Sequence, residues 1–86
     1  MGEYRVALVR SARRELESLP RATADRILAA LERLTADPRP PGSRKLHGAA
    51  DLWRLRVGDY RVVYVINDAQ KLVDVRVVRH RKDAYR

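Results

Sequence analysis

The segment LWRLRVGDYRVVY, residues 52–64, contains three arginines in a stretch that otherwise has the pattern of a β-sheet core. Apolar and basic residues alternate over 52–57, and residues 60–66 are rich in β-branched and aromatic types, so each run predicts a strand. Between them, Gly58-Asp59 matches the glycine-first signal for a two-residue hairpin turn. This turn predicts that Arg56 lies opposite Arg61, with Arg54 on the same face of the sheet.

A directly opposed pair of arginines needs a reason, because like charges across two strands destabilise a sheet by roughly 0.2–1 kcal/mol. The arrangement becomes favourable when an anion lies between the guanidinium groups, which match phosphate or carboxylate bidentately. We therefore interpret Arg54, Arg56 and Arg61 as a phosphate-binding group. The alternative is that the three side chains extend into water, where salt screens their repulsion. The interpretation depends on the turn, because a one-residue slip would move Arg54 and Arg56 to the other face.

The segment RHRKDAYR, residues 79–86, holds the other candidates for chemistry. His80 can act as a general acid or base near neutral pH, and Tyr85 can stack on a nucleobase. Arg79, Arg81 and Lys82 add positive charge that suits a nucleic acid. The alternative is a solvated chain terminus with no binding role.

Arg44 and Lys45, in the segment SRKLHG, precede the first arginine strand and are further candidates for contact with the same ligand. They can equally be ordinary loop polarity, and we favour that interpretation for His47. Two separated histidines without carboxylates at ligand spacing predict no metal site. No glycine-rich phosphate loop and no Ser-His-Asp set is visible, so no cofactor is expected.

Length and charge limit the class of protein. The 86 residues suffice for one small domain, 1–86. Residues 1–38 carry seven Lys/Arg against six Asp/Glu, whereas residues 39–86 carry twelve against five, so most of the net charge of +8 belongs to the second half. This asymmetry favours a polyanionic partner. The absence of cysteine, of an export signal and of a membrane-length apolar run leads us to expect a cytoplasmic protein without membrane contact.

The remaining pattern predicts an α+β domain. A strand is expected over 3–9, then a short helix capped by Ser11, then a second helix with Pro20 at its first position and an apolar stripe of Ala24, Ile27, Leu28, Leu31 and Leu34. Asp37-Pro38 should end this helix, and residues 38–51 should form a loop. Strands over 52–57, 60–66 and 72–78 complete an antiparallel meander. We expect one sheet, with the two antiparallel helices on one face and a short turn or helix at the end.

The segments KLHG, LWRLRVGDYRVVYVI and VVRHRKDAYR together resemble the RelE toxins of the RelE/ParE superfamily. The resemblance covers the whole chain and implies a strand–helix–helix–meander fold. It also implies a toxin that enters the ribosomal A site and cleaves messenger RNA without a metal. In that chemistry the ribose 2′-hydroxyl attacks the adjacent phosphorus and leaves a 2′,3′-cyclic phosphate and a 5′-hydroxyl.

The resemblance also implies roles for individual residues. Arg61 matches the hairpin arginine that contacts the scissile phosphate. Arg81, with Arg79 as the alternative, matches the arginine that stabilises charge or protonates the leaving oxygen, and Tyr85 matches the tyrosine that orients the cut nucleotide. Arg54 and Arg56 replace two lysines of some members, one of them proposed as the base; since arginine is not deprotonated in proteins, the base would be His80, Tyr85 or a water.

The resemblance further implies a RelB-like antitoxin as partner and therefore a hetero-oligomer. The positive charge of the chain suggests that the antitoxin's binding segment is acidic or amphipathic and folds on binding. Two other functions stay open. One is a ParE-like inhibitor of DNA gyrase that needs no catalytic residues, and the other is a non-toxic basic interaction module.

Overall fold

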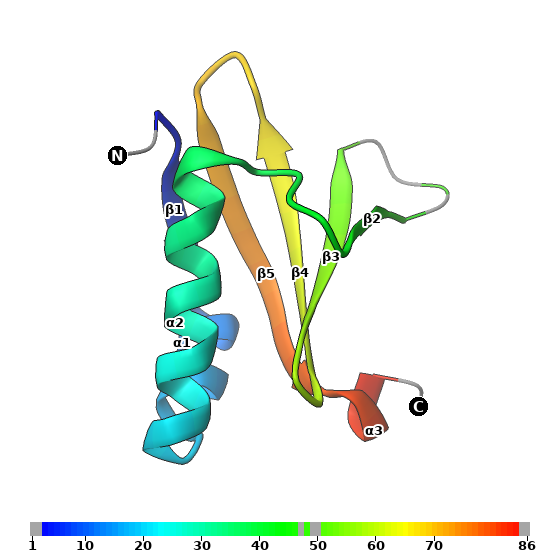
Figure 1. Cartoon of the computed structure of the whole chain (residues 1–86). Helices are drawn as coiled ribbons and strands as arrows, with labels where there is room; N and C mark the ends of the chain where they lie inside the picture. Colours follow the sequence, from blue (N-terminus) through cyan, green and yellow to red (C-terminus); the bar gives the residue numbers. More distant parts are fainter. Residues whose placement is uncertain (1–2, 47, 49–50, 85–86) are drawn as a thin grey trace.

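Two helices cover one face of a five-stranded sheet in the computed structural model, which describes residues 3–46, 48 and 51–84 (Figure 1). The described elements, in chain order, are β1 (Arg5–Leu8), α1 (Arg10–Glu17), α2 (Arg21–Ala36), β2 (Ser43–Lys45), β3 (Leu52–Val57), β4 (Tyr60–Asn67), β5 (Leu72–His80) and α3 (Arg81–Ala84).

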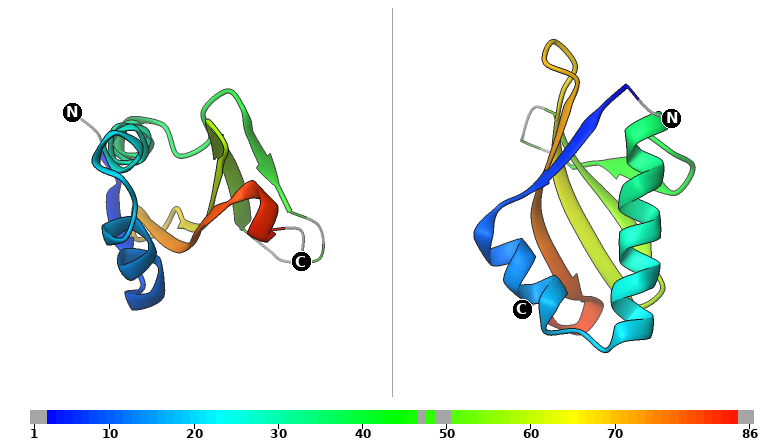
Figure 2. Two further views of the ribbon diagram at one scale, coloured as in Figure 1. Left: turned by 90° about the horizontal axis from the view of Figure 1, so that it is seen from below. Right: turned by 90° about the vertical axis from the view of Figure 1, so that its left-hand side faces the viewer.

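The strand order in the sheet is β1-β5-β4-β3-β2. The pairs from β5 to β2 are antiparallel, as expected for a meander, whereas β1 runs parallel to the last strand. Both α1 and α2 lie on the same side of the twisted sheet, and the short α3 lies on the other side (Figures 1 and 2). The predicted α+β architecture is confirmed.

The core lies between the two helices and the sheet. Every second residue of β4 points toward it, including the fully buried Val62, Tyr64 and Ile66. Helix α2 contributes Ile27, Ala30, Leu31 and Leu34. Leu28 was expected in this stripe, but it is 48% exposed, because it is one residue past Ile27 and so about 100° around the helix.

Both predicted helix starts are one residue or more in error. Ser11 lies inside α1, and Val9 occupies the N-cap position without a side-chain hydrogen bond. The cause is tertiary: the Val9 N–H still bonds to the Val75 oxygen of β5, so the chain passes from strand to helix within one residue. Pro20 precedes α2 as its N-cap rather than opening it. The predicted stop is confirmed, with Asp37 in an extended conformation after Ala36.

The hairpin between β3 and β4 has the predicted register. Val57 lies opposite Tyr60 and Arg56 lies opposite Arg61. Gly58 has φ of +59°, the left-handed region that a glycine-first two-residue turn requires. The turn therefore determines which side chains of both strands face the helices.

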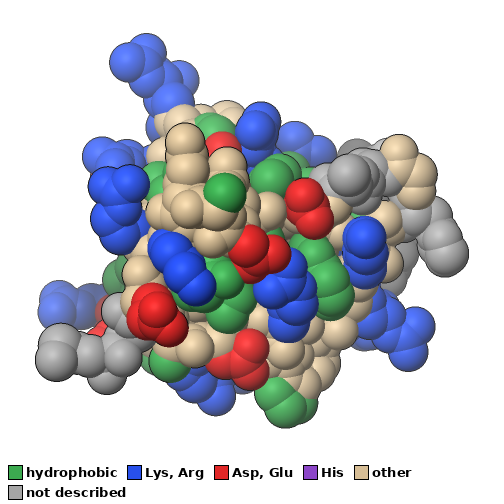
Figure 3. Space-filling view, turned by 90° about the horizontal axis from the view of Figure 1, so that it is seen from above, with side chains coloured by type: hydrophobic (Ala, Val, Ile, Leu, Met, Phe, Trp, Pro, Cys, Tyr) green, Lys and Arg blue, Asp and Glu red, His purple; other side chains and the backbone are tan. Residues whose placement is uncertain are grey.

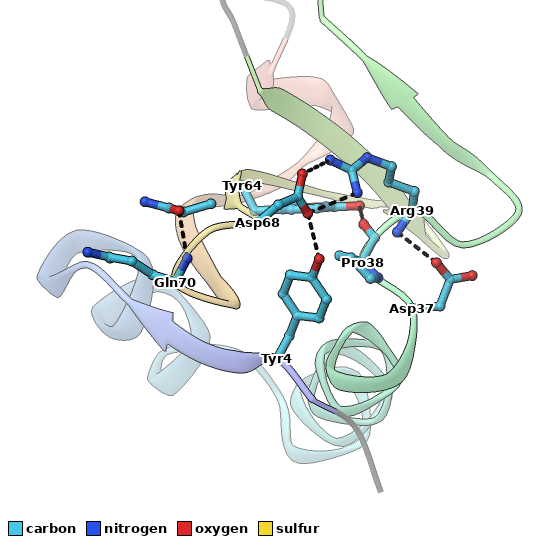
Figure 4. Close-up of polar contacts among 8 residues, drawn as sticks. Tyr4, Asp37, Pro38, Arg39, Tyr64, Asp68 and Gln70 are labelled. Carbon is cyan, nitrogen blue, oxygen red and sulfur yellow. Dashed lines mark hydrogen bonds and ion pairs between the residues drawn. The ribbon is translucent and has the colours of Figure 1, made fainter.

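The segment 38–51 was predicted as a loop, but residues 43–45 form the edge strand β2 against β3. Three contacts hold the approach to it, and Figure 4 shows the two hydrogen-bonded ones. The buried Tyr64 hydroxyl donates to the Pro38 carbonyl oxygen at 2.9 Å. The Arg39 guanidinium donates to both Asp68 oxygens at 2.8 and 3.3 Å and lies 5.4 Å from the Trp53 ring. These contacts direct an otherwise irregular segment along the sheet edge.

Asp68 joins this anchor to the first strand, because it also accepts a hydrogen bond from the Tyr4 hydroxyl. The Arg39 guanidinium, followed by the Tyr4 hydroxyl, lowers the pKa of Asp68 to about 2. The same carboxylate raises the pKa of Tyr4. Three segments far apart in sequence thus meet on one carboxylate.

We expect Gly58→Ala to lower the free energy of unfolding by about 1–2 kcal/mol, because a side chain in the left-handed region strains the backbone. Steric contact with the new methyl group should add little to this loss, because the atoms nearest to an added Cβ belong to the flexible end of the Arg26 side chain. Urea unfolding measures the change. Gly58→Asn, which tolerates this region better, should lose less, and an equal loss in both variants would contradict the explanation.

We expect Asp68→Asn to destabilise the protein at neutral pH but not in acid. A carboxylate whose pKa is lower in the folded state stabilises the fold above its ordinary pKa of 3.8, and that contribution disappears as the pH falls toward 2. The difference in unfolding free energy between parent and variant should therefore shrink between about pH 4 and pH 2. Asp25→Asn, at an exposed site on α2, is the control.

Candidate nucleic-acid interface

Three arginines form a row across three neighbouring strands. Arg56 of β3 lies opposite Arg61 of β4, and Arg61 lies opposite Arg79 of β5. The residues that flank them in sequence, Val62 and Val78 among them, are buried under the helices, so the arginines point to the opposite face. Directly opposed residues in a sheet have Cβ atoms about 4.5–5.5 Å apart, which places the three guanidinium groups within reach of one anion.

A second pair extends the row toward the sheet edge. Arg44 of β2 lies opposite Arg54 of β3, and Arg54 is two residues before Arg56 on the same face. We call this surface the arginine face; it comprises Arg44, Arg54, Arg56, Arg61 and Arg79. The predicted side-by-side placement of Arg54, Arg56 and Arg61 is confirmed.

Arg79 joins the arginine face because β5 contains an irregularity. The register with β4 shifts between Val63 and Tyr64, so Val63 lies opposite Val77 while Tyr64 lies opposite Val75. Without this shift, strict alternation from the buried Val75 would turn Arg79 toward the helices. The sequence signal is the apolar pair Val77-Val78, which interrupts the alternation.

His80 lies on the helix-covered face, away from the arginine face. It is opposite Tyr60, and the two rings meet edge to face with centroids 5.2 Å apart. Together with Thr23, Arg26 and Asp59 it lines a cavity of about 240 Å³. The structure therefore does not bring His80 together with the other candidates for chemistry.

The tail forms the brief helix expected, after a strand that is two residues longer than predicted. Helix α3 starts at Arg81, whose backbone N–H donates to the Asp59 carbonyl oxygen at 2.7 Å. Figure 1 shows α3 beside the hairpin turn, on the side of the sheet away from α1 and α2. Arg81 and Lys82 are exposed there. Tyr85 and His47 lie outside the described residues.

Lys45 lies apart from Arg44, although it is the next residue. It pairs with Trp53 in the register, so alternation places it on the other face from Arg44 and Arg54. Of the two candidate residues of β2, only Arg44 belongs to the arginine face.

The end of the molecule far from α3 has a different charge pattern. Figure 3 shows acidic side chains interspersed with basic ones on this end. Arg39 pairs with Asp68 and Lys71 pairs with Glu3 there. Positive charge at this end is therefore paired with negative charge.

The arginine face can bind an anion and stabilise developing negative charge, since each guanidinium is permanently charged and offers several donors. It supplies no group that accepts a proton. Within residues 3–46, 48 and 51–84, no three His, Cys, Asp or Glu residues are grouped to hold a metal ion. None of the helices described is long and apolar enough to cross a membrane.

Comparison with known proteins adds a family and a set of relatives. Residues 6–85 match the profile of the family described as ParE toxin of type II toxin-antitoxin system, parDE. Among curated proteins, the chain is 35% identical to Toxin RelG of Mycobacterium tuberculosis, over 96% of this chain and 97% of that protein. It is 24% identical to Putative toxin RelE1 of Methanocaldococcus jannaschii, over 98% of this chain and 97% of that protein.

Solved structures of toxin–antitoxin complexes share the fold. The archaeal RelE-RelB complex from Pyrococcus horikoshii matches with a TM-score of 0.83 and 34% identity, covering 92% of this chain and 96% of that one. The RelBE2 complex of Mycobacterium tuberculosis matches with a TM-score of 0.80 and 28% identity, covering 91% of this chain and 98% of that one.

We expect inorganic phosphate to raise the melting temperature of the protein relative to chloride at equal ionic strength, because an anion that binds only the folded state stabilises it. Arg61→Gln should lose most of this rise, since Arg61 is the central member of the row. Arg33→Gln, with the same charge change on α2, should retain it. Equal rises in all three proteins would show that the arginine face holds no phosphate.

Proposed function

Because the chain belongs to the family of ParE toxins of type II toxin–antitoxin systems, we propose that it acts as a ribosome-dependent endoribonuclease that cleaves messenger RNA in the A site. The observation that carries the proposal is the row of Arg56, Arg61 and Arg79 across three strands. A phosphodiester is the anion that such a row fits best, because each non-bridging oxygen can accept from a guanidinium fork.

The proposed reaction breaks one P–O bond and forms another. The ribose 2′-hydroxyl loses its proton and attacks phosphorus, negative charge accumulates on the non-bridging oxygens, and the 5′-oxygen departs with a proton. The products are a 2′,3′-cyclic phosphate and a 5′-hydroxyl. Arg61 and Arg56 stabilise the non-bridging oxygens, and Arg81 or Arg79 stabilises the negative charge on the leaving oxygen, which takes up its proton from water. Each preorganised donor of this kind is typically worth about 2.7–4 kcal/mol in the transition state.

The proton acceptor is not one of the arginines. Arg54 and Arg56 stay protonated at any physiological pH. His80 lies on the far face, beside Tyr60. We therefore assign the base to Tyr85 or to a water molecule, with Tyr85 also stacking on the cut nucleotide.

An antitoxin is the expected partner of this toxin. Relatives of similar fold have been solved as complexes of RelE with RelB. We propose that this chain likewise forms a hetero-oligomer with a RelB-like antitoxin in the cytoplasm. The net charge of +8 predicts that the binding segment of the antitoxin is acidic or amphipathic.

Inhibition of DNA gyrase is the second candidate, supported by the match to the ParE profile and by arginines at the lysine positions. DNA damage signalling without loss of messenger RNA would favour it.

We expect induced expression to arrest growth and to create new 5′ ends in cellular messenger RNA, with 5′-hydroxyl groups. Arg61→Ala and Arg81→Ala should each lower cleavage by roughly 10²–10³-fold and relieve the arrest, because each removes a donor from the developing charge. Mapping of 5′ ends before and after induction measures this.

Arg13→Ala, at an exposed site on α1, is the matched control and should arrest growth like the parent. If folded Arg61→Ala and Arg81→Ala proteins arrest growth as strongly as the parent, the nuclease assignment is wrong.

A further inference from the structure

We propose that His80 is a positioning residue that caps α3 and so holds Arg81 beside the arginine face, rather than a group that exchanges protons with the substrate. Its effect on RNA cleavage rests on the proposed function, whereas the cap itself does not.

The hydrogen bonds at the start of α3 carry this inference. His80 is the last residue of β5 and immediately precedes the helix, which is the N-cap position. Its ring Nδ1 accepts from the backbone N–H of Lys82, the second helical residue, at 3.2 Å. N-cap side chains commonly satisfy this amide. The preceding amide, of Arg81, donates to the Asp59 carbonyl oxygen at 2.7 Å. Two of the amides that a helix start leaves without intrahelical partners are thereby satisfied.

The ring is held in place from the helix-covered side. Tyr60 of β4 packs edge to face against it, and Arg26 of α2 and Asp59 of the hairpin turn line the same cavity. A phosphodiester bound to the arginine face would contact the side chain of Arg79. The side chain of His80, the next residue, points to the other face of the sheet. The position of the His80 side chain therefore suits a hydrogen bond to the backbone of α3 rather than contact with the ligand.

The cap requires the neutral imidazole. A ring that accepts at Nδ1 carries its hydrogen at Nε2, and protonation of Nδ1 would replace the acceptor by a donor facing the Lys82 N–H. The charged or titratable residues that line the cavity beside the ring are Arg26 of α2 and Asp59 and Tyr60 of the hairpin.

The asparagine variant separates a cap from a proton carrier. Its side-chain oxygen can accept from the Lys82 amide, but it does not titrate. We expect hydrogen-exchange NMR at pH 8 to show similar protection of the Lys82 amide in the parent and in His80→Asn. His80→Ala should reduce that protection by roughly five- to thirty-fold.

His80→Ser, another cap residue, repeats the test if the asparagine variant folds poorly. Equal protection of Lys82 in the parent and in His80→Ala would overturn the proposal.

RNA cleavage supplies a second, separate measurement. His80→Asn should cleave like the parent, and His80→Ala should cleave less. A protected but inactive His80→Asn protein would identify His80 as a proton carrier and overturn the proposal. If the parent itself cleaves no RNA, the nuclease assignment fails, and the amide protection of Lys82 still decides the cap.

Discussion

The two-residue reversal at Gly58-Asp59 is the constraint on which the rest of this molecule depends. A strand has a side-chain period of two, so the register of one hairpin decides the face of every residue on β3 and β4. The reversal turns Val62 and Tyr64 inward and Arg56 and Arg61 outward. One backbone conformation therefore builds the apolar layer beneath the helices and the cationic layer on the other side. It also presents the Asp59 carbonyl that receives the first amide of α3.

Stability and the proposed anion binding place opposite demands on the arginine face. Opposed guanidinium groups weaken a sheet that has no ligand, and a small domain has little stability to lose. Other stabilising interactions lie away from this face, in the buried valines of β5 and in the carboxylate of Asp68, which joins three segments at the far end. These interactions are therefore separate from the proposed anion site.

The parts of the structure that follow from local chemistry could be predicted from the sequence. The register of β3 and β4, the stop at Asp37 and the grouping of Arg54, Arg56 and Arg61 all depend on residues close together in the chain. The other features depend on distant contacts. β2 forms because Tyr64 and Asp68 hold the segment before it, and the faces of Arg79 and His80 depend on a register shift in β5. Alternation alone would have exchanged those two faces.

The parallel pairing of β1 with β5 has a consequence for how the molecule forms. Arg5 lies opposite Leu72, so the first strand has no strand to pair with until nearly all of these residues have been synthesised. Pairings between residues so far apart in sequence are slow, because a long loop must close before they form. A nascent chain therefore carries its N-terminal strand unpaired during most of translation. The five-stranded sheet is therefore complete only after β5 is available.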